Sequence, residues 1–286
     1  MGTTSTPTAD VEEVCNYVDA LLFARSEIAK PRGLPISVSL LNAAHAILMR
    51  GVRGAKKQPG SIRTSQNWIG GSRPGNAAFV PPPHLKLSNL LTSLEKYIHS
   101  PDQLPPIVRA GLVHVQFETI HPYLDGNGRI GRLLITLLLE HWGLLSQPLL
   151  YISLYLKQNQ DEYYRRLASV RKTGDWEGWT GFFLTAVIET ANEAVTMISN
   201  LFSLVTQDRG RVLAHSTMSV AAIRLFEQLP KHPIITTAAV MKLLEISKPT
   251  AGRAIDTLVE VGVLVETTGK KRDRTYIYKN YLDCLN

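Results

Sequence analysis

The stretch HPYLDGNGRIGRLLITLLLEHW, residues 121–142, joins a glycine-rich polar loop to an apolar segment, and it decides the fold that we predict for this chain. From Ile130 onward the segment is apolar on nearly every face of a helix, and Gly143 follows as a stop signal. A helix without a polar face is buried by its neighbours on all sides. We therefore expect a mainly α fold in which this helix is central and the polar loop lies at its N-terminal end.

The composition limits the class of protein. The chain has 286 residues, and 31 Lys and Arg against 24 Asp and Glu give a net charge of +7. This length suits one large domain and a second, smaller one. The basic balance suits anionic partners such as nucleotides or nucleic acid without choosing between them, and it also fits a merely soluble basic protein.

The cysteines and the apolar runs indicate a cytoplasmic location. Cys15 and Cys284 are far apart and outside any metal-ligand spacing, so neither a disulfide framework nor a zinc site is supported. No apolar run approaches the roughly 18 residues of a membrane span, and the N-terminus lacks the basic and apolar regions of a signal peptide. We therefore expect a cytoplasmic protein with no membrane partner.

Helical periodicity continues through most of the chain as far as residue 207. Apart from the central helix, the segments with helical spacing are residues 10–30, 36–51, 85–100, 107–120, 156–172 and 176–207. Residues 51–83 interrupt the periodicity, because they are dense in Gly, Pro, Ser and Asn with two short β-like patches, which is typical of a functional loop or a hairpin. We expect a disordered leader over residues 1–9 and a helical domain over 10–207.

A second domain is predicted over residues 208–286. The basic stretch 208–216 marks the boundary, and three short helices and two β-rich runs around a charged turn follow it. Three helices and a β-hairpin are the order of a winged-helix domain, with 248–261 as the recognition helix and 268–274 as the wing.

The polar loop has the residue types of a phosphate site. Gly126 and Gly128 let backbone N–H groups approach an anion without a Cβ in the way, and the helix that follows adds unpaired N–H groups and a positive dipole end. Asn127 can orient a phosphate oxygen. Arg129 and Arg132, three residues apart, project from one helix face as fork-shaped donors suited to a polyphosphate.

A metal ligand and a base accompany this cradle. Asp125 supplies a hard oxygen that suits a Mg²⁺ bridging two phosphates. His121 has an ordinary pKa near neutrality and could take a proton from an incoming hydroxyl. No GxxxxGK[ST] string occurs in the chain, so a Walker-type loop is excluded. The residues thus predict nucleotide-dependent transfer of a phosphorus group to a hydroxyl.

These residues also carry a family resemblance. HPYLDGNGRIGR resembles the signature of the Fic (filamentation induced by cAMP) family, His-Pro-Phe-x-(Asp/Glu)-Gly-Asn-Gly-Arg-x-x-Arg, with Tyr123 in place of Phe. The aromatic anchor is kept, but its hydroxyl needs a partner. Further blocks that resemble the family, in the family order over roughly residues 10–200, are GVRG, PGSIRTSQNWIGG, AAFVPPP and DWEGWTGFFL.

The resemblance implies a helical bundle with a β-hairpin flap at about 59–82. It implies a protein adenylyltransferase, which moves AMP from ATP to a Ser, Thr or Tyr hydroxyl of a target protein, or of the chain itself, and releases pyrophosphate. His121 would be the base and Asp125 would bind Mg²⁺. The phosphates would be held by Gly126, Asn127, Gly128, Arg129 and, at the γ-phosphate, Arg132. Relatives that transfer phosphate depart from the Gly-Asn-Gly-Arg segment, which this chain keeps, and that favours adenylylation.

Other roles follow from the same resemblance. Asn159 and Tyr163 are candidates for the adenine side, although Tyr163 could equally be a packing aromatic. Trp68, Ile69 and Gly70 belong to the flap, whose edge would pair with a target segment as an added strand. The alternative for Trp68 is that it packs on the core.

Many relatives carry an inhibitory helix with the pattern (Ser/Thr)-x-x-x-Glu-(Gly/Asn), whose glutamate engages the second arginine of the motif. The one match here, TGDWEG at 173–178, lies on a Gly-Asp turn of an ordinary family block, and we do not interpret it as the inhibitor. Two explanations for the missing inhibitory helix remain. The protein is inhibited in trans or not at all, or the sequence is a shortened version of a longer protein, and we favour the second explanation. Arg132 is then free, the chain is active, and removal of AMP is lost.

The second domain leaves another class of function open. Lys248, Thr250 and Arg253 of the recognition helix, with Lys270, Lys271, Arg272 and Arg274 of the wing, could contact DNA. A role in protein docking or as a homodimer contact is the alternative. For the whole chain, the rival is a DNA-binding transcriptional regulator whose Fic-like part senses nucleotide. The complete set of base, metal ligand and arginines favours the enzyme.

Overall fold

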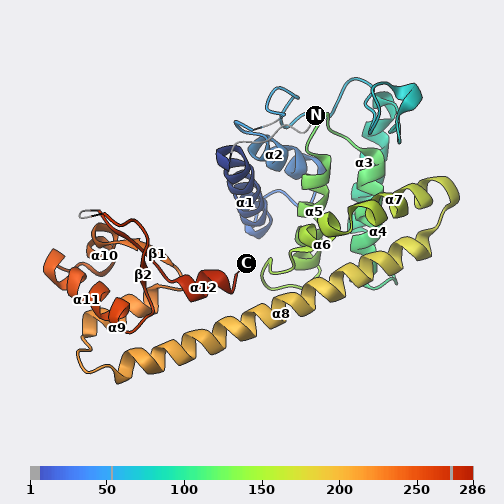
Figure 1. Cartoon of the computed structure of the whole chain (residues 1–286). Helices are drawn as coiled ribbons and strands as arrows, with labels where there is room; N and C mark the ends of the chain where they lie inside the picture. The colour runs from blue at the N-terminus through green and yellow to red at the C-terminus, as the bar shows by residue number, and fades with distance from the viewer. Residues whose placement is uncertain (1–6, 53, 271–272, 286) are drawn as a thin grey trace. The chain divides into compact units, whose positions relative to one another are not determined.

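The computed structural model describes residues 7–52, 54–270 and 273–285, and these residues are mainly helical (Figure 1). They form two compact units, Met1–Ala191 and Asn192–Asn286, each described here by itself. The division falls within helix α8 (Trp176–Ala214), whereas the sequence places the boundary at 208. Helix α8 continues past residue 208 because Val212 is buried in the hydrophobic core of the second unit.

The predicted disordered leader, residues 1–9, needs a correction at its end. Residues 1–6 lie outside the described part of the chain, but helix α1 begins at Pro7. Proline suits the first turn of a helix because the N–H that it lacks has no partner there.

The first unit is a helical bundle. Its elements are α1 (Pro7–Ala29), α2 (Val38–Leu48), the short 3-10 helices η1 (Pro74–Asn76) and η2 (His84–Lys86), α3 (Leu87–His99), α4 (Pro106–Ile120), α5 (Asn127–His141), α6 (Ile152–Gln158), α7 (Gln160–Thr173) and the start of α8. Helix α5 contacts α1, α2 and α4, and Figure 1 shows α4 and α5 side by side. The residues of α5 from Leu133 to Leu139 are buried, so the prediction of a central helix is confirmed.

The flap is much shorter than a regular hairpin. Ile69 and Phe79 form a single antiparallel bridge, with N–H to C=O distances of 2.8 and 3.2 Å. Gly70 and Gly71 have φ values of 68° and 70°, which turn the chain away after one pair. Prolines over 81–83 lack the N–H groups that a longer ladder needs.

Within its described residues, the second unit contains the predicted three helices and hairpin, and one strand and one short helix more. Its elements after α8 are α9 (Val220–Gln228), β1 (Ile234–Thr236), α10 (Thr237–Leu244), α11 (Lys248–Glu260), β2 (Val265–Glu266), β3 (Thr275–Ile277) and α12 (Lys279–Asp283). The strands form an antiparallel sheet in the order β1-β3-β2. Residues 271–272 of the predicted wing lie outside the described residues, and the winged-helix assignment stays a prediction.

Strand β1 was missed because three residues are too few to show a period. Its register pairs Ile235 with Tyr276, and both side chains are buried. The sheet therefore closes one side of a core made by α9, α10 and α11. Among the described helices, none combines the length and the apolar character that a bilayer crossing requires.

A buried hydrogen bond fastens the end of α8 to this core. Tyr278 donates from its hydroxyl to Asp208 Oδ2 over 2.7 Å, and both side chains are fully buried. Arg211 contacts the other carboxylate oxygen. A buried carboxylate is tolerated only with such partners.

We predict that Asp208→Ala destabilises the second unit by about 1–3 kcal/mol, since it leaves the Tyr278 hydroxyl buried without an acceptor. Scanning calorimetry of the full chain measures this loss. The control is Asp283→Ala, which breaks the exposed Lys279–Asp283 pair and should change stability by less than about 0.5 kcal/mol. Equal effects of the two variants would contradict the role given to Asp208.

Candidate active site

The loop between α4 and α5 is held by two left-handed residues. His121 ends α4 with φ 50°, and its N–H donates to Phe117 O over 2.9 Å. Gly126 precedes α5 with φ 79°. A Cβ on Gly126 would lie 2.9 Å from Met49 Sδ and 3.1 Å from His45 Nε2. Only glycine therefore fits at the start of this helix.

The Asn127 side chain closes the loop from inside. Tyr123 N–H donates to Asn127 Oδ1, and Asn127 Nδ2 donates to Tyr123 O, each over 2.8 Å. Both groups of the amide are thus used within the protein. The side chain of Asn127 is therefore not available for the predicted phosphate contact. Only the backbone N–H of Asn127, in the first turn of α5, could make that contact.

A histidine of α2 supports the loop from the core side. Gly60 N–H donates to His45 Nδ1 over 2.9 Å, so His45 carries its proton on Nε2 and donates to Asp125 O at 3.0 Å. Its ring stacks on Tyr123 at 4.0 Å between centroids. The Tyr123 hydroxyl finds its partner in Asn42 Oδ1 at 2.9 Å. Burial lowers the pKa of His45, which keeps the imidazole in its neutral form.

Arg63 ties the flap to the loop, and sequence reasoning missed it. Its guanidinium, 1% exposed, donates to three carbonyls, those of His121 at 2.9 Å, Ser65 at 3.0 Å and Pro82 at 2.5 Å. Its own N–H donates to Pro122 O over 2.9 Å. No pattern around Arg63 signals these bonds, because they depend on segments that are distant in the sequence.

Each of the two motif arginines has a buried nitrogen that makes no hydrogen bond within the described part of the chain. Arg129 Nη1 and Arg132 Nε are buried without a hydrogen bond in the described residues. Arg129 lies 3.5 Å from Glu13 of α1 and 3.9 Å from Asp125. Arg132 Nη1 would lie 3.1 Å from a Cβ on Gly128, so it covers the first turn of α5. Buried donors without partners, beside a helix N-terminus, are groups that an anion would satisfy.

Asp125 is placed to share a metal with such an anion. Its Oδ1 accepts the Gly126 N–H over 2.6 Å, and 31% of the side chain is exposed. No cluster of three or more metal-ligating side chains occurs in the described ranges. A single carboxylate fits Mg²⁺ when phosphate oxygens and water complete the shell. The residues therefore fit Mg²⁺ together with a polyphosphate and not as a separate metal centre.

His121 is neutral where a base is needed. Burial, followed by the positive charge of Arg171, lowers its pKa to about 4. Its Nδ1 lies 4.0 Å from Glu118 Oε2. Burial raises the pKa of Glu118 to about 7 despite the nearby Arg132 and Arg171. At neutral pH the imidazole of His121 is unprotonated and can accept a proton. Glu118 is about half ionised at this pH, because its pKa is about 7.

Arg171, also missed from the sequence, links α7 to this region. It donates to Glu118 O over 3.2 Å and to Thr119 Oγ1 over 3.3 Å. Its guanidinium lies 3.8 Å from the centre of the Phe79 ring in the flap. It thus joins the flap to the end of the helix that positions the base.

The structure corrects the prediction for Tyr163. Its side chain is 6% exposed and its hydroxyl lies 2.9 Å from His114 Nε2. His114 Nδ1 in turn lies 3.1 Å from Gly131 O, which can only accept, so Nε2 accepts the tyrosine proton. Tyr163 therefore supports α5 as a packing aromatic and has no free face for adenine. The adenine prediction for Asn159, which lies between α6 and α7, stays a prediction.

The flap residues lie apart from the core. Trp68 is 39% exposed, so it is not an interior side chain. Asn67 Nδ2 reaches Tyr123 O at 3.3 Å and attaches this part of the flap to the loop. Trp68, Ile69 and Gly70 follow this attached residue along the chain, and their role as a target-docking edge stays a prediction.

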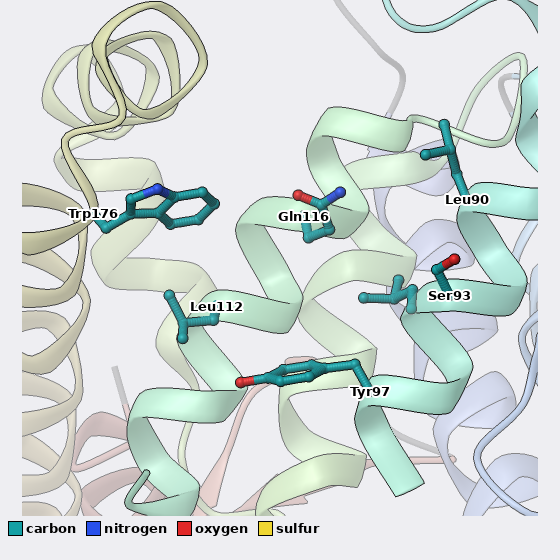
Figure 2. A pocket seen from close by; sticks show the side chains of 7 residues that line it. Leu90, Ser93, Tyr97, Leu112, Gln116 and Trp176 are labelled. Atoms are coloured by element: carbon teal, nitrogen blue, oxygen red, sulfur yellow. The ribbon is translucent and has the colours of Figure 1, made fainter. Parts of the chain in front are cut away.

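An apolar hollow of about 410 Å³ lies elsewhere in the first unit (Figure 2). It is formed by α3, α4 and the start of α8, and its lining residues are Leu90, Ser93, Leu94, Tyr97, Leu112, Gln116 and Trp176. None of the predicted site residues is among them. The hollow is therefore no part of the candidate active site.

The first unit is a helical bundle with a candidate anion-binding site at the N-terminus of its central helix. Residues 35–139 match the model of the Fic/DOC family, and this part of the chain is a Fic/DOC domain. A probable protein adenylyltransferase of Aquifex aeolicus is 36% identical over 70 residues, 24% of this chain and 22% of that protein. Protein adenylyltransferase Fic of Drosophila mojavensis is 29% identical over 175 residues, 59% of this chain and 32% of that protein. The chain spans about a third or less of these relatives.

Solved structures agree with the fold. A Fic family protein from Desulfovibrio desulfuricans G20 has a TM-score of 0.59 and 24% identity, covering 96% of this chain and 77% of that one. A Fic domain containing signaling protein from Bacteroides thetaiotaomicron has a TM-score of 0.52 and 19% identity, covering 68% and 75%. The predicted Fic-type helical fold is confirmed.

We predict that Gly126→Ala abolishes binding of MgATP. Alanine at this positive φ costs about 1–2 kcal/mol, and its Cβ would push Met49 and His45 away from the loop. Calorimetric titration measures affinity. Gly143→Ala is the control, because Gly143 has a similar φ of 73° and, apart from its chain neighbours, no atom of the described residues within 4 Å of its Cβ position. Gly143→Ala should lower the stability of the chain and leave its affinity for MgATP unchanged. Wild-type affinity in Gly126→Ala would show that the loop is not the nucleotide site.

We also predict an acid-sensitive core. The pKa values of His114 and His121 fall from 6.5 to about 4 on folding, so the unfolded chain binds more protons between these values. Stability is therefore lost as pH falls from 6.5 towards 4, by up to about 3 kcal/mol for each histidine. Glu118 acts oppositely, because its pKa rises from 4.5 to about 7, so its contribution is fully present below pH 4.5 and is lost as pH rises from 4.5 through 7.

Urea unfolding at several pH values tests these signs. The slope of stability against pH below 6.5 should flatten in His114→Gln. In Glu118→Gln, stability relative to wild type should rise between pH 4.5 and 7. Slopes are compared because either substitution also removes contacts. Unchanged slopes would mean that these groups titrate normally in the folded chain.

Proposed function

We propose that this protein is a protein adenylyltransferase, which transfers AMP from ATP to a Ser, Thr or Tyr hydroxyl of a target protein and releases pyrophosphate. The observation that carries the proposal is a neutral, largely buried His121 beside a helix N-terminus where two arginines have buried nitrogens without a hydrogen bond in the described residues. The relatives named protein adenylyltransferase support the same activity.

The proposed reaction has a role for each motif residue. His121 removes the proton of the target hydroxyl, whose oxygen attacks the α-phosphorus as the bond to the β-phosphate oxygen breaks. Asp125 would bind Mg²⁺, which supplies positive charge to the α- and β-phosphates. The first N–H groups of α5 and Arg129 hold the phosphate oxygens, and Arg132 binds the γ-phosphate.

The flap can hold the target backbone. Ile69 uses both its N–H and its C=O in the bridge to Phe79. In an antiparallel pair the neighbouring residues direct their groups to the opposite side. For the Trp68 C=O and the Gly70 N–H, no hydrogen bond is found in the described residues. These two groups could pair with an extended target segment, as in strand addition.

We predict that the chain labels protein from α-³²P-ATP with Mg²⁺, and that His121→Ala lowers the rate by about 10²–10⁴-fold. The incubation is made with and without a cell lysate, which separates a foreign target from self-modification. His141→Ala, at the C-terminal end of α5 and so at the opposite end of that helix from the motif loop, is the matched control and should keep the activity.

The other outcomes identify the rivals. Label from γ-³²P-ATP would indicate a kinase. No label from either nucleotide, together with salt-sensitive binding to duplex DNA that survives His121→Ala, would favour the DNA-binding regulator. For that alternative, the second unit offers Lys248 and Arg274 with Thr236 and Thr237 around one hollow. Asp256 and Glu260, exposed on the same recognition helix, count against it.

A further inference from the structure

A buried carboxylate lies beside the proposed base. Glu118 is in the last turn of α4, 6% exposed, and its Oε2 is 4.0 Å from His121 Nδ1. Glu118 Oε1 and His121 Nδ1 are both buried, and neither has a hydrogen bond in the described residues. The imidazole nitrogen without a hydrogen bond thus faces the carboxylate through Oε2, while Oε1 is the carboxylate oxygen that has no partner there.

We propose that Glu118 is a positioning residue for His121: its carboxylate accepts the Nδ1–H of the imidazole and stabilises the imidazolium formed when Nε2 takes the proton of the target hydroxyl. The inference rests on the proposed function and goes beyond it, since it assigns a second group to the proton transfer. In this proposal Glu118 acts through His121 and not on the nucleotide or the target directly.

The surroundings leave the carboxylate free for this role. Charged and titratable groups face it from each element packed against it, namely Arg132 on α5, Arg171 and Tyr163 on α7, and His121. Both arginines attract it, but in the described chain only His121 comes within ion-pair distance. A Cβ on Gly131 would lie 2.6 Å from Oε1, so glycine at this position makes room for the carboxylate.

The rival acceptor for Nδ1–H is a backbone carbonyl. Glu118 O also faces the His121 ring and favours its charged form. That oxygen already accepts from Arg171 Nη2 over 3.2 Å. A carbonyl paired with a cation is a poorer acceptor for a developing imidazolium than an ionised carboxylate.

The chemistry follows from a defined tautomer. With its proton on Nδ1, His121 presents the Nε2 lone pair to the hydroxyl, so one O–H bond breaks and one N–H bond forms. The negative charge of Glu118 then compensates the positive charge of the ring. Because burial raises the pKa of Glu118 to about 7, the ionised form appears as pH rises through that value.

The test is the pH profile of AMP transfer. Wild-type kcat should rise with pH around 7, whereas a base acting alone would give a limb near its own pKa of about 4. Glu118→Gln should lower kcat at least about tenfold and remove the limb near 7, with KM for ATP within twofold. Glu118→Asp should recover part of kcat. Glu140→Gln, a partly buried glutamate at the other end of α5, should behave as wild type.

Three results would overturn the proposal. One is wild-type kcat in Glu118→Gln. Another is a lower kcat with the limb near 7 intact, which a structural role would give. The third is a change confined to KM for ATP, which would assign Glu118 to Arg132 instead.

A second measurement separates this proposal from the proposed function. The ¹⁵N shifts of the His121 ring in the full chain, followed against pH, should respond near pH 7 in wild type and not in Glu118→Gln. This response needs no transferase activity. Its absence in wild type would overturn the coupling even if AMP transfer is found, and its presence would sustain the coupling even if AMP transfer fails.

Discussion

The paired hydrogen bonds between the Asn127 amide and the backbone of Tyr123 are the constraint on which the site depends. They close the loop before α5, and they require the left-handed glycine at 126. With the loop closed, Asp125 lies directly before the N-terminal residues of α5. A buried amide with both groups satisfied is costly to disturb, so the loop is rigid before any ligand binds.

Segments from the rest of the first unit fasten this loop from outside. His45 reaches it from α2, Arg63 brings the base of the flap to the carbonyls of His121 and Pro82, and His114 with Tyr163 supports Gly131 from below. These hydrogen bonds are made by buried polar groups. A buried polar group without a partner costs free energy, so the bonds favour one conformation of the loop. The burial that they require also removes water from His121, and this desolvation keeps the imidazole neutral.

Much of the fold was readable from local pattern. The all-round apolar character of residues 133–139 predicted the central helix, and the glycines of the loop predicted the turn and the helix start. Prediction failed where a role depended on which way a side chain turns. Asn127 has the right type for a phosphate contact, yet its amide bonds the loop itself. Tyr163 is an aromatic near the site, yet its hydroxyl is used by His114.

The sequence by itself determined the chemical set of the site, because His121, Asp125, Arg129 and Arg132 lie within twelve consecutive residues and a loop followed by a helix brings them together. Only the tertiary structure decided the protonation of that set and the groups that hold it. Arg63, Glu118 and Arg171 have no local signature, and their places depend on how the flap, α4 and α7 pack. A pKa depends on solvent and charge around a group, and these are properties of the folded chain rather than of a motif.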